Sequence, residues 1–274
     1  MTTESHTTTY LREGYVVLED AIPPDCLAEV CESYEQTLET ALRLEMVQRD
    51  EDTGFLKGYR FQDPHHPALA RYPLMDALSA PEILSFAHKL YPGEVAMHGA
   101  AAFAMNDDYD YKGPWHRDSY YLWGKDSAME KQVREDVNAP STQVLIALED
   151  DDAFWFVPGS HNRANTVEEE AHFVEERTSS QEMFPGAIQL QVRAGSAVPF
   201  DWRGIHRGVK LPGKRRRSLF AVYGTKEGVK HAGISKWALE SEYSEPKYLE
   251  SLPEPFRQSV ENTIEALQTE SAGE

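Results

Sequence analysis

The chain has 274 residues, of which 27 are lysine or arginine and 46 are aspartate or glutamate, giving a formal net charge of −19 at pH 7. This acidic excess argues against binding nucleic acid or an anionic membrane through a general basic surface. No apolar run approaches membrane-spanning length, and the N-terminus lacks a basic-then-apolar signal pattern. The two cysteines, Cys26 and Cys31, have a poor spacing for a disulfide, so we expect a reducing, cytoplasmic compartment.

The first hundred residues predict scaffold. Residues 14–18 form a short β-rich run, and the prolines that follow open a helix whose apolar residues recur every three or four positions to residue 42. Residues 46–72 are irregular and polar. The adjacent histidines there, His65 and His66, indicate a surface loop bordering a pocket rather than a metal site, because neighbours in an extended chain point opposite ways. A helix is expected over 75–90 and a strand over 95–105.

A histidine and an aspartate two positions apart, His116 and Asp118, follow the loop of residues 106–114. In an extended strand both would project from the same face. One later histidine could complete a set of two histidines and one carboxylate with open positions, which suits non-haem Fe(II). The pair alone is a weak signal, and an exposed polar strand is the alternative. The aromatic run at residues 119–123 predicts either core packing or a pocket wall beside a metal.

The second half predicts many short strands. Residues 143–148 form an apolar run typical of a strand buried on both faces. The acidic turn at 149–152 lacks the ligand spacing of a calcium loop, so we interpret it as solvated. Residues 154–161 are a strand ending in a Pro-Gly turn, and 162–184 could form a helical lid. Further strands are expected at residues 188–192, 196–200 and 217–223, with a helical tail beyond residue 224.

Several motifs stand in an order and spacing that resemble one enzyme family. They are Gly14-Tyr15-Val16-Val17-Leu18 with Ile22-Pro23-Pro24, Trp115-His116-Arg117-Asp118, Ala147-Leu148-Glu149-Asp150, Val157-Pro158-Gly159-Ser160-His161, and His206 followed eleven positions later by Arg217. Over about residues 10–224 the chain is similar to the phytanoyl-CoA dioxygenase family of Fe(II)- and 2-oxoglutarate-dependent oxygenases.

The resemblance implies a mainly β fold, a double-stranded β-helix or jelly roll with peripheral helices. The many short strands, the Gly/Pro turns and the lack of βαβ alternation agree with it. We therefore expect a single dioxygenase domain over residues 1–274, with a helical C-terminal extension at 225–274.

By the resemblance, His116, Asp118 and His206 are the iron ligands, and Arg217 anchors the distal carboxylate of 2-oxoglutarate. A planar, permanently charged guanidinium suits that task. In a strand, Arg217 and its neighbour Arg216 face opposite ways, so one of them can turn inward while the other stays in solvent.

The implied reaction uses Fe(II), 2-oxoglutarate and O2 to oxidise a C–H bond of a small molecule, with release of succinate and CO2. Asp118 occupies the position that family-like halogenases replace with glycine or alanine, so we expect hydroxylation or another oxidation rather than halogenation. The expected partner is a natural-product or amino-acid-like small molecule, with no nucleic acid and no membrane. The sequence gives no prediction of the oligomeric state.

Six side chains are candidates for the substrate pocket. Two arginines could contact an anionic group and four aromatic residues could form its walls: Arg117, Arg203, Tyr120, Tyr121, Trp123 and Trp155. Two alternative functions remain open. A cupin-type metalloenzyme that uses no cosubstrate would leave Arg217 without an obvious partner in the barrel, and a catalytically silent metal- or 2-oxoglutarate-binding module would not need the intact triad.

Overall fold

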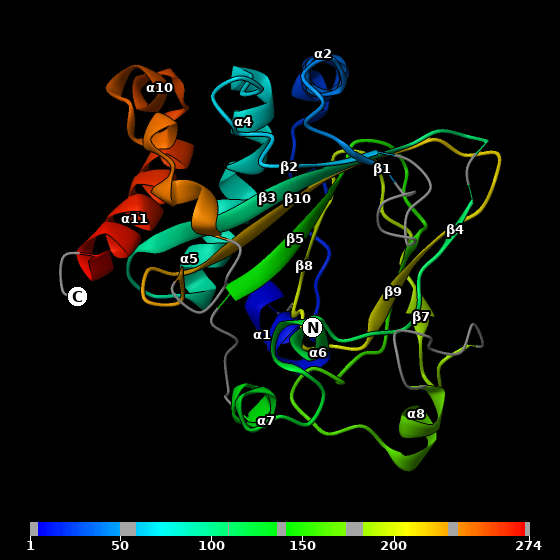
Figure 1. The fold of residues 1–274 in the computed structure, drawn as a ribbon. Coiled ribbons are helices and arrows are strands. Elements are labelled where there is room, and N and C mark those ends of the chain that lie inside the picture. Colours follow the sequence, from blue (N-terminus) through cyan, green and yellow to red (C-terminus); the bar gives the residue numbers. More distant parts are fainter. Residues whose placement is uncertain are drawn as a thin grey trace.

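Two antiparallel sheets face each other at the centre of the molecule (Figure 1). The computed structural model describes residues 5–49, 59–108, 110–135, 141–173, 183–229 and 235–271. The larger sheet has the strand order β1 (Gln48–Arg49), β2 (Tyr59–Gln62), β3 (Val95–Met105), β10 (Arg216–Thr225), β5 (Ser141–Ala147) and β8 (Ala197–Phe200). The smaller sheet has the order β4 (Tyr111–Lys112), β9 (His206–Lys210), β6 (Phe154–Phe156) and β7 (Ile188–Gln189). The expected double-stranded β-helix is confirmed.

Side chains alternate between the two faces of the larger sheet, as the strand period requires. On β10, Leu219, Ala221 and Tyr223 face outward and are fully buried under the helices. Phe220 faces inward and packs with Leu145 of β5 against the smaller sheet. The molecule thus has one core between sheet and helices and a second core between the sheets.

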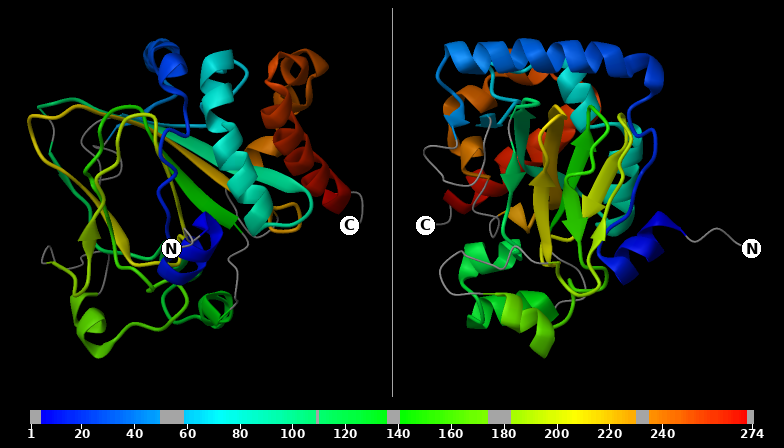
Figure 2. Two further views of the ribbon diagram at one scale, coloured as in Figure 1. Left: turned by 180° about the vertical axis from the view of Figure 1, so that it is seen from behind. Right: turned by 90° about the vertical axis from the view of Figure 1, so that its right-hand side faces the viewer.

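The helices form a layer on the outer face of the larger sheet (Figure 2). They are α2 (Pro24–Arg43), α4 (Tyr72–Leu78), α5 (Pro81–Leu90), α10 (Pro246–Ser251) and α11 (Glu254–Ser271), with the short 3₁₀ helices η1 (Ser235–Leu239) and η2 (Ser241–Ser244) beside them. Helix α11 is tied to β3 because Asn262 donates to the carbonyl of Val95 and Thr263 to that of Met97, at 2.9 and 2.8 Å. No helix in the described part of the chain is long and apolar enough to cross a membrane.

The described chain also contains α1 (His6–Glu13), which packs on α5 with the Tyr10 and Phe86 ring centroids 5.3 Å apart, and, away from this layer, α6 (Asp118–Trp123), α7 (Ala128–Glu135) and α8 (Val167–His172). The last three lie together at one end of the sheets (Figure 1). Helix α8 begins at a capping box, in which Thr166 and Glu169 bond each other's backbone N–H groups. Such a box satisfies two of the free N–H groups at a helix start.

Several expected elements differ from the structure. The single helix expected over 75–90 is two helices, because Pro81 cannot continue the first of them. Residues 59–62, expected to be irregular, are strand β2. The aromatic run at 119–123 is helical, and the lid expected over 162–184 contains the helix α8 but lies in part outside the described residues.

Candidate metal centre

The candidate ligands come from the ends of two paired segments. His116 and His206 form an antiparallel bridge, in which each backbone N–H donates to the other's carbonyl at 3.0 and 2.9 Å. Asp118 follows one extended residue later, as the first residue of α6, and its N–H donates to the carbonyl of Trp202 at 3.0 Å. The chain is therefore extended only as far as Arg117. The start of a helix, and not a strand, determines the position of the carboxylate.

The structure brings His116, Asp118 and His206 together. The Nε2 atoms of His116 and His206 lie 3.4 and 3.8 Å from the two carboxylate oxygens of Asp118. One ligand atom from each residue lies within 4.8 Å of the others. On the far side of each ring, Nδ1 lies 2.9 Å from a backbone carbonyl, that of Pro114 or Gly204.

These carbonyl contacts determine which nitrogen can bind a metal. A carbonyl only accepts, so Nδ1 of each ring carries a proton, which leaves Nε2, beside Asp118, as the atom that can bind a metal. This is the arrangement that carbonyls impose on metal-binding histidines in general. Gln143 of β5 holds the carboxylate from behind, because its Nε2 donates to Asp118 Oδ2 at 2.6 Å. The donor set fits a first-row divalent metal with open coordination positions.

The charge states of the three groups also favour metal binding. Burial would raise the pKa of Asp118, but the neighbouring His206 and the hydrogen bond from His116 hold it at about 2. Burial lowers the pKa of His206 to about 4, helped by the charge of His116. Burial opposes protonation of His116 as well, but its hydrogen bond with Asp118 leaves its pKa raised. At neutral pH the site thus offers an anionic carboxylate and a neutral His206.

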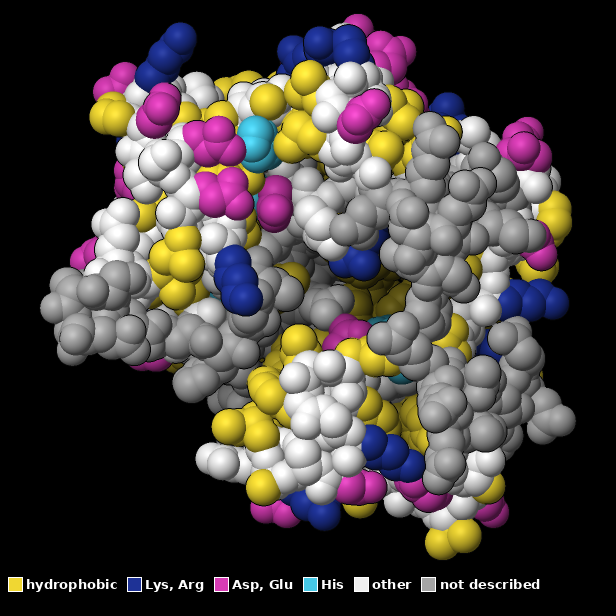
Figure 3. Space-filling model, in the orientation of Figure 1, with side chains coloured by type: hydrophobic (Ala, Val, Ile, Leu, Met, Phe, Trp, Pro, Cys, Tyr) yellow, Lys and Arg dark blue, Asp and Glu magenta, His cyan; other side chains and the backbone are white. Residues whose placement is uncertain are grey.

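Aromatic rings surround the histidines on the barrel side. The ring of His206 lies 5.2 Å from that of Phe200 and 6.4 Å from that of Phe156. Gly204 permits this packing, because a Cβ there would lie 2.2 Å from the Phe156 ring. Figure 3 shows a hollow in which acidic, histidine and apolar side chains are exposed. The triad is accessible from outside, with Asp118 partly exposed.

Among the predicted substrate residues, Tyr121 contacts one of the candidate metal ligands. Its ring centroid lies 5.4 Å from that of His116, and the side chain is half exposed. Tyr120 instead packs on Phe173 and bonds Asn165, and Trp123 packs on Trp202.

Trp155 is placed on the wrong face for a pocket wall. It alternates with Phe154 and Phe156, which face the barrel interior, so its own ring points outward. There it packs with Trp115, and the guanidinium of Arg207 lies 5.7 Å from its ring. The expectation that it contacts substrate is corrected by the strand period.

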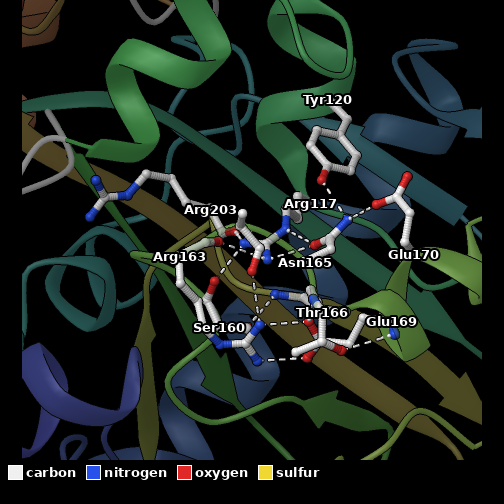
Figure 4. Close-up of polar contacts among 11 residues, drawn as sticks. Arg117, Tyr120, Ser160, Arg163, Asn165, Thr166, Glu169, Glu170 and Arg203 are labelled. Carbon is white, nitrogen blue, oxygen red and sulfur yellow. Dashed lines mark hydrogen bonds and ion pairs between the residues drawn. The ribbon is translucent and has the colours of Figure 1, made fainter.

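Arg117 and Arg203 are buried, and Figure 4 shows Arg117 among its polar contacts with Ser160, Asn165 and Arg203. Arg117 is fully buried and donates to the carbonyls of Ser160 and Arg203 and to the side chain of Asn165. Arg203 is paired with Asp201 at 2.7 Å and is 1% exposed. These internal partners argue against the prediction that the two arginines contact an anionic substrate. Arg117 instead fixes the metal-ligand segment to the Pro-Gly-Ser-His turn.

Arg217 is not brought to the triad. It shares the outward face of β10 with Leu219, and its Nε donates to Glu35 of α2 at 2.7 Å. The preceding Arg216 points the other way, together with Ser218 and Phe220. Arg216 is buried and its Nε donates to Asp151 at 2.7 Å. Asp151, expected in a solvated turn, is thus itself buried.

Sequence reasoning missed that Gln143 contacts Asp118 and that Ser218 and Arg60 lie on the inward face of the larger sheet. Gln143 was treated only as the start of an apolar strand, and Arg60 as part of a polar loop. The alternation Arg60-Phe61-Gln62 could have indicated a strand with one polar and one apolar face. A second group, His66 with Glu240 and Glu242, also lies within ligand distance, but it is largely exposed and His66 pairs with Glu242 at 2.7 Å.

The model of the family described as phytanoyl-CoA dioxygenase (PhyH) matches residues 10–218. The chain belongs to the PhyH family. The match includes every residue of the triad, Arg216 and Arg217. A search of curated proteins found no match.

Solved structures of similar fold include metal- and 2-oxoglutarate-bound enzymes. EctD from S. alaskensis with bound Fe has a TM-score of 0.60 at 18% identity, covering 81% of this chain and 76% of that one. The epimerase SnoN in complex with Fe3+, alpha ketoglutarate and nogalamycin RO has a TM-score of 0.58 at 16% identity, covering 81% and 83%. HygX from Streptomyces hygroscopicus with nickel, 2-oxoglutarate and hygromycin B has a TM-score of 0.54 at 19% identity, covering 81% and 87%. These likenesses support the double-stranded β-helix of this member of the PhyH family.

Proposed function

We propose that this PhyH-family protein is an Fe(II)- and 2-oxoglutarate-dependent oxygenase. It oxidises a C–H bond of a small molecule and releases succinate and CO2. The observation that carries the proposal is the arrangement of His116, Asp118 and His206, in which both Nε2 atoms lie beside one carboxylate. Three open positions remain on such a set, enough for a bidentate cosubstrate and oxygen.

The chain's own residues would hold the iron and keep its geometry. His116 and His206 would bind through Nε2, with their orientation fixed by the carbonyls of Pro114 and Gly204. Asp118 would bind through one oxygen while Gln143 keeps the other. When bound, the iron supplies oxygen activation, and the protein supplies ligand geometry and a partly desolvated pocket.

We assign the binding of the distal carboxylate of 2-oxoglutarate to Arg216 and Ser218, in place of Arg217. Both are buried and lie on the inward face of β10. The hydroxyl of Ser218 has no hydrogen-bond partner within the described structure, and Arg216 uses its Nε for Asp151. A guanidinium and a hydroxyl two residues apart on a strand can hold one carboxylate together.

We propose further that the oxidation is a hydroxylation or a related oxidation, and not a halogenation. Asp118 occupies a coordination position that a halide would need, and it is anionic at every physiological pH. Once a substrate is known, its product formed in excess chloride or bromide should contain no halogen by mass spectrometry. A halogenated product would contradict the role given to Asp118 while leaving the iron site intact.

The test of the function is anaerobic addition of Fe(II) and then 2-oxoglutarate. We expect a weak visible charge-transfer band from the chelate, and succinate formation when oxygen is admitted with a substrate. His206→Ala should abolish the band, whereas His88→Ala, on an exposed part of α5, should keep it. Iron binding without a 2-oxoglutarate-dependent band would favour the cosubstrate-independent enzyme instead.

The substrate is a small molecule, and we retain the cytoplasm as the proposed compartment because both cysteines are free.

A further inference from the structure

Besides Arg216 of β10, Arg60 of β2 is a cationic side chain that points toward the hollow. Arg60 lies opposite Phe103 of β3 in the sheet register, and cross-strand partners share a face. Phe61, between Arg60 and Gln62, is fully buried against the helices, so Arg60 and Gln62 point inward. The guanidinium lies 5.2 Å from the centre of the Phe103 ring.

The charge of Arg60 is not neutralised by an ion pair with any described residue. Arg215, Arg216, Arg217 and Arg203 each lie within ion-pair distance of an aspartate or a glutamate. Arg60 instead contacts the Gln62 amide, whose oxygen, when turned toward it, accepts from Nη2 at 2.7 Å and from Nε at 3.1 Å.

Burial lowers the pKa of Arg60, and of the surrounding charges Asp118 has the largest effect on it. When a metal is bound at the triad, much of the negative charge of Asp118 is taken up by the metal. The partly desolvated guanidinium then keeps only the weaker influence of Tyr111 and Asp63, neither of which forms an ion pair with it in the described structure. Burying such a cation is costly unless an anion meets it.

An aromatic wall connects Arg60 with the metal centre. Phe103 lies against Phe220, with ring centroids 5.0 Å apart, and Phe220 lies 6.4 Å from Phe200. Phe200 in turn lies 5.2 Å from the ring of His206. Phe103 and Phe220 are both partly exposed, so an apolar ligand can contact them.

Arg60 is separate from the proposed cosubstrate anchor. It pairs across the sheet with Phe103, and Phe103 with Ser218, so Arg60 and Ser218 lie on the first and third of three adjacent strands. With strands about 4.8 Å apart, their backbones are roughly 10 Å apart. Two carboxylates can therefore be bound at once, one at each position.

We propose that Arg60, with Gln62 beside it, binds a carboxylate on the substrate. The inference rests on the proposed oxygenase function and names its substrate class as an organic acid with an apolar body. The body lies along Phe103 and Phe220, and the oxidised carbon lies at the triad end. Arg60 is in this sense a specificity-determining residue.

The experiment uses the anaerobic holoenzyme with Fe(II) and saturating 2-oxoglutarate. Straight-chain carboxylic acids from butanoate to decanoate, and the corresponding amides, are titrated by calorimetry while the visible band of the chelate is followed. At least one acid should bind more tightly than its amide. Arg60→Gln should weaken binding of that acid by about 10- to 100-fold, because a hydrogen bond to a charged group is lost. Arg60→Lys should recover part of this affinity.

The controls separate three causes of failure. Arg60→Gln should leave the affinity for 2-oxoglutarate unchanged, and Arg193→Gln, at an exposed surface pair, should leave both affinities unchanged. Equal binding of acid and amide, binding of no acid in the series, or a loss of 2-oxoglutarate affinity in Arg60→Gln would each overturn the assignment. If the unmodified protein forms no band with Fe(II) and 2-oxoglutarate, it is the proposed function that fails.

Discussion

Substituting two adjacent arginines, one at a time, tests which face of β10 binds the cosubstrate. Arg216→Gln removes a buried guanidinium from the inward face, and Arg217→Gln removes one from the outward face. The substitutions are chemically identical and one residue apart. Only the strand period distinguishes their effects.

The structure gives the size of each effect. A hydrogen bond to a charged group contributes about 1.5–3 kcal/mol, which corresponds to a rise of roughly 10- to 150-fold in the 2-oxoglutarate Kd of Arg216→Gln. Arg217 instead bonds Glu35 at 2.7 Å and the carbonyl of Met105 at 3.0 Å. Because the Glu35 side chain is 40% exposed, its pair is screened, and we expect Arg217→Gln to cost only about 1–2 kcal/mol of unfolding free energy.

Anaerobic titration of the visible band measures the Kd, and urea denaturation measures the stability. Arg216→Gln leaves the buried Asp151 without its partner and could unfold the protein. Ser218→Ala is therefore the second variant, since it removes only the hydroxyl, and it should also raise the 2-oxoglutarate Kd. Weaker cosubstrate binding in Arg217→Gln, with unchanged binding in Ser218→Ala, would refute the reasoning.

Three further predictions concern the supports of the site. Arg117→Met should lower the unfolding free energy by about 2–5 kcal/mol in urea, because two buried carbonyls lose their donor, and a change below about 1 kcal/mol would contradict the structural role. Gln143→Leu should weaken Fe(II) binding by roughly 10- to 100-fold in a metal-competition assay, since it frees Asp118 Oδ2, and wild-type affinity would count against this positioning. Burial, with a contribution from Glu240, raises the pKa of Asp63 to about 7. The unfolded chain therefore ionises first, and the native state loses stability as the pH rises from about 4 through 7. Asp63→Asn should remove this part of the pH dependence of Tm, and an unchanged profile would show that Asp63 ionises normally.

The three candidate ligands could be predicted from the sequence because they lie within short, ordered motifs that resemble one family. His116 and Asp118 are two residues apart, and His206 follows a strand and a turn, but the helix that begins at Asp118 was not predicted. The long strands β3 and β5 were predicted within a few residues because each consists largely of small and apolar residues. Strand β2 was missed because it has only four residues and follows a polar segment.

The direction of each arginine could not be obtained in this way. Four adjacent basic residues end at Arg217, and the sequence does not fix which of them begins the inward-facing series. The register of β10 against β3 and β5 decides it, because a shift of one residue exchanges the two faces of a strand.

By itself, then, the sequence indicated the family, the barrel and the three candidate ligand positions, all of which depend on the order and spacing of residues along the chain. The tertiary structure decided which cations reach the hollow. It turned Arg117 and Arg217 into structural residues with partners of their own, and it placed Arg60, far from the ligands in sequence, on the inward face of the same barrel. Burial and partnership of a charged side chain depend on segments distant in the chain, and these are set only when the sheets pair and the helices cover them.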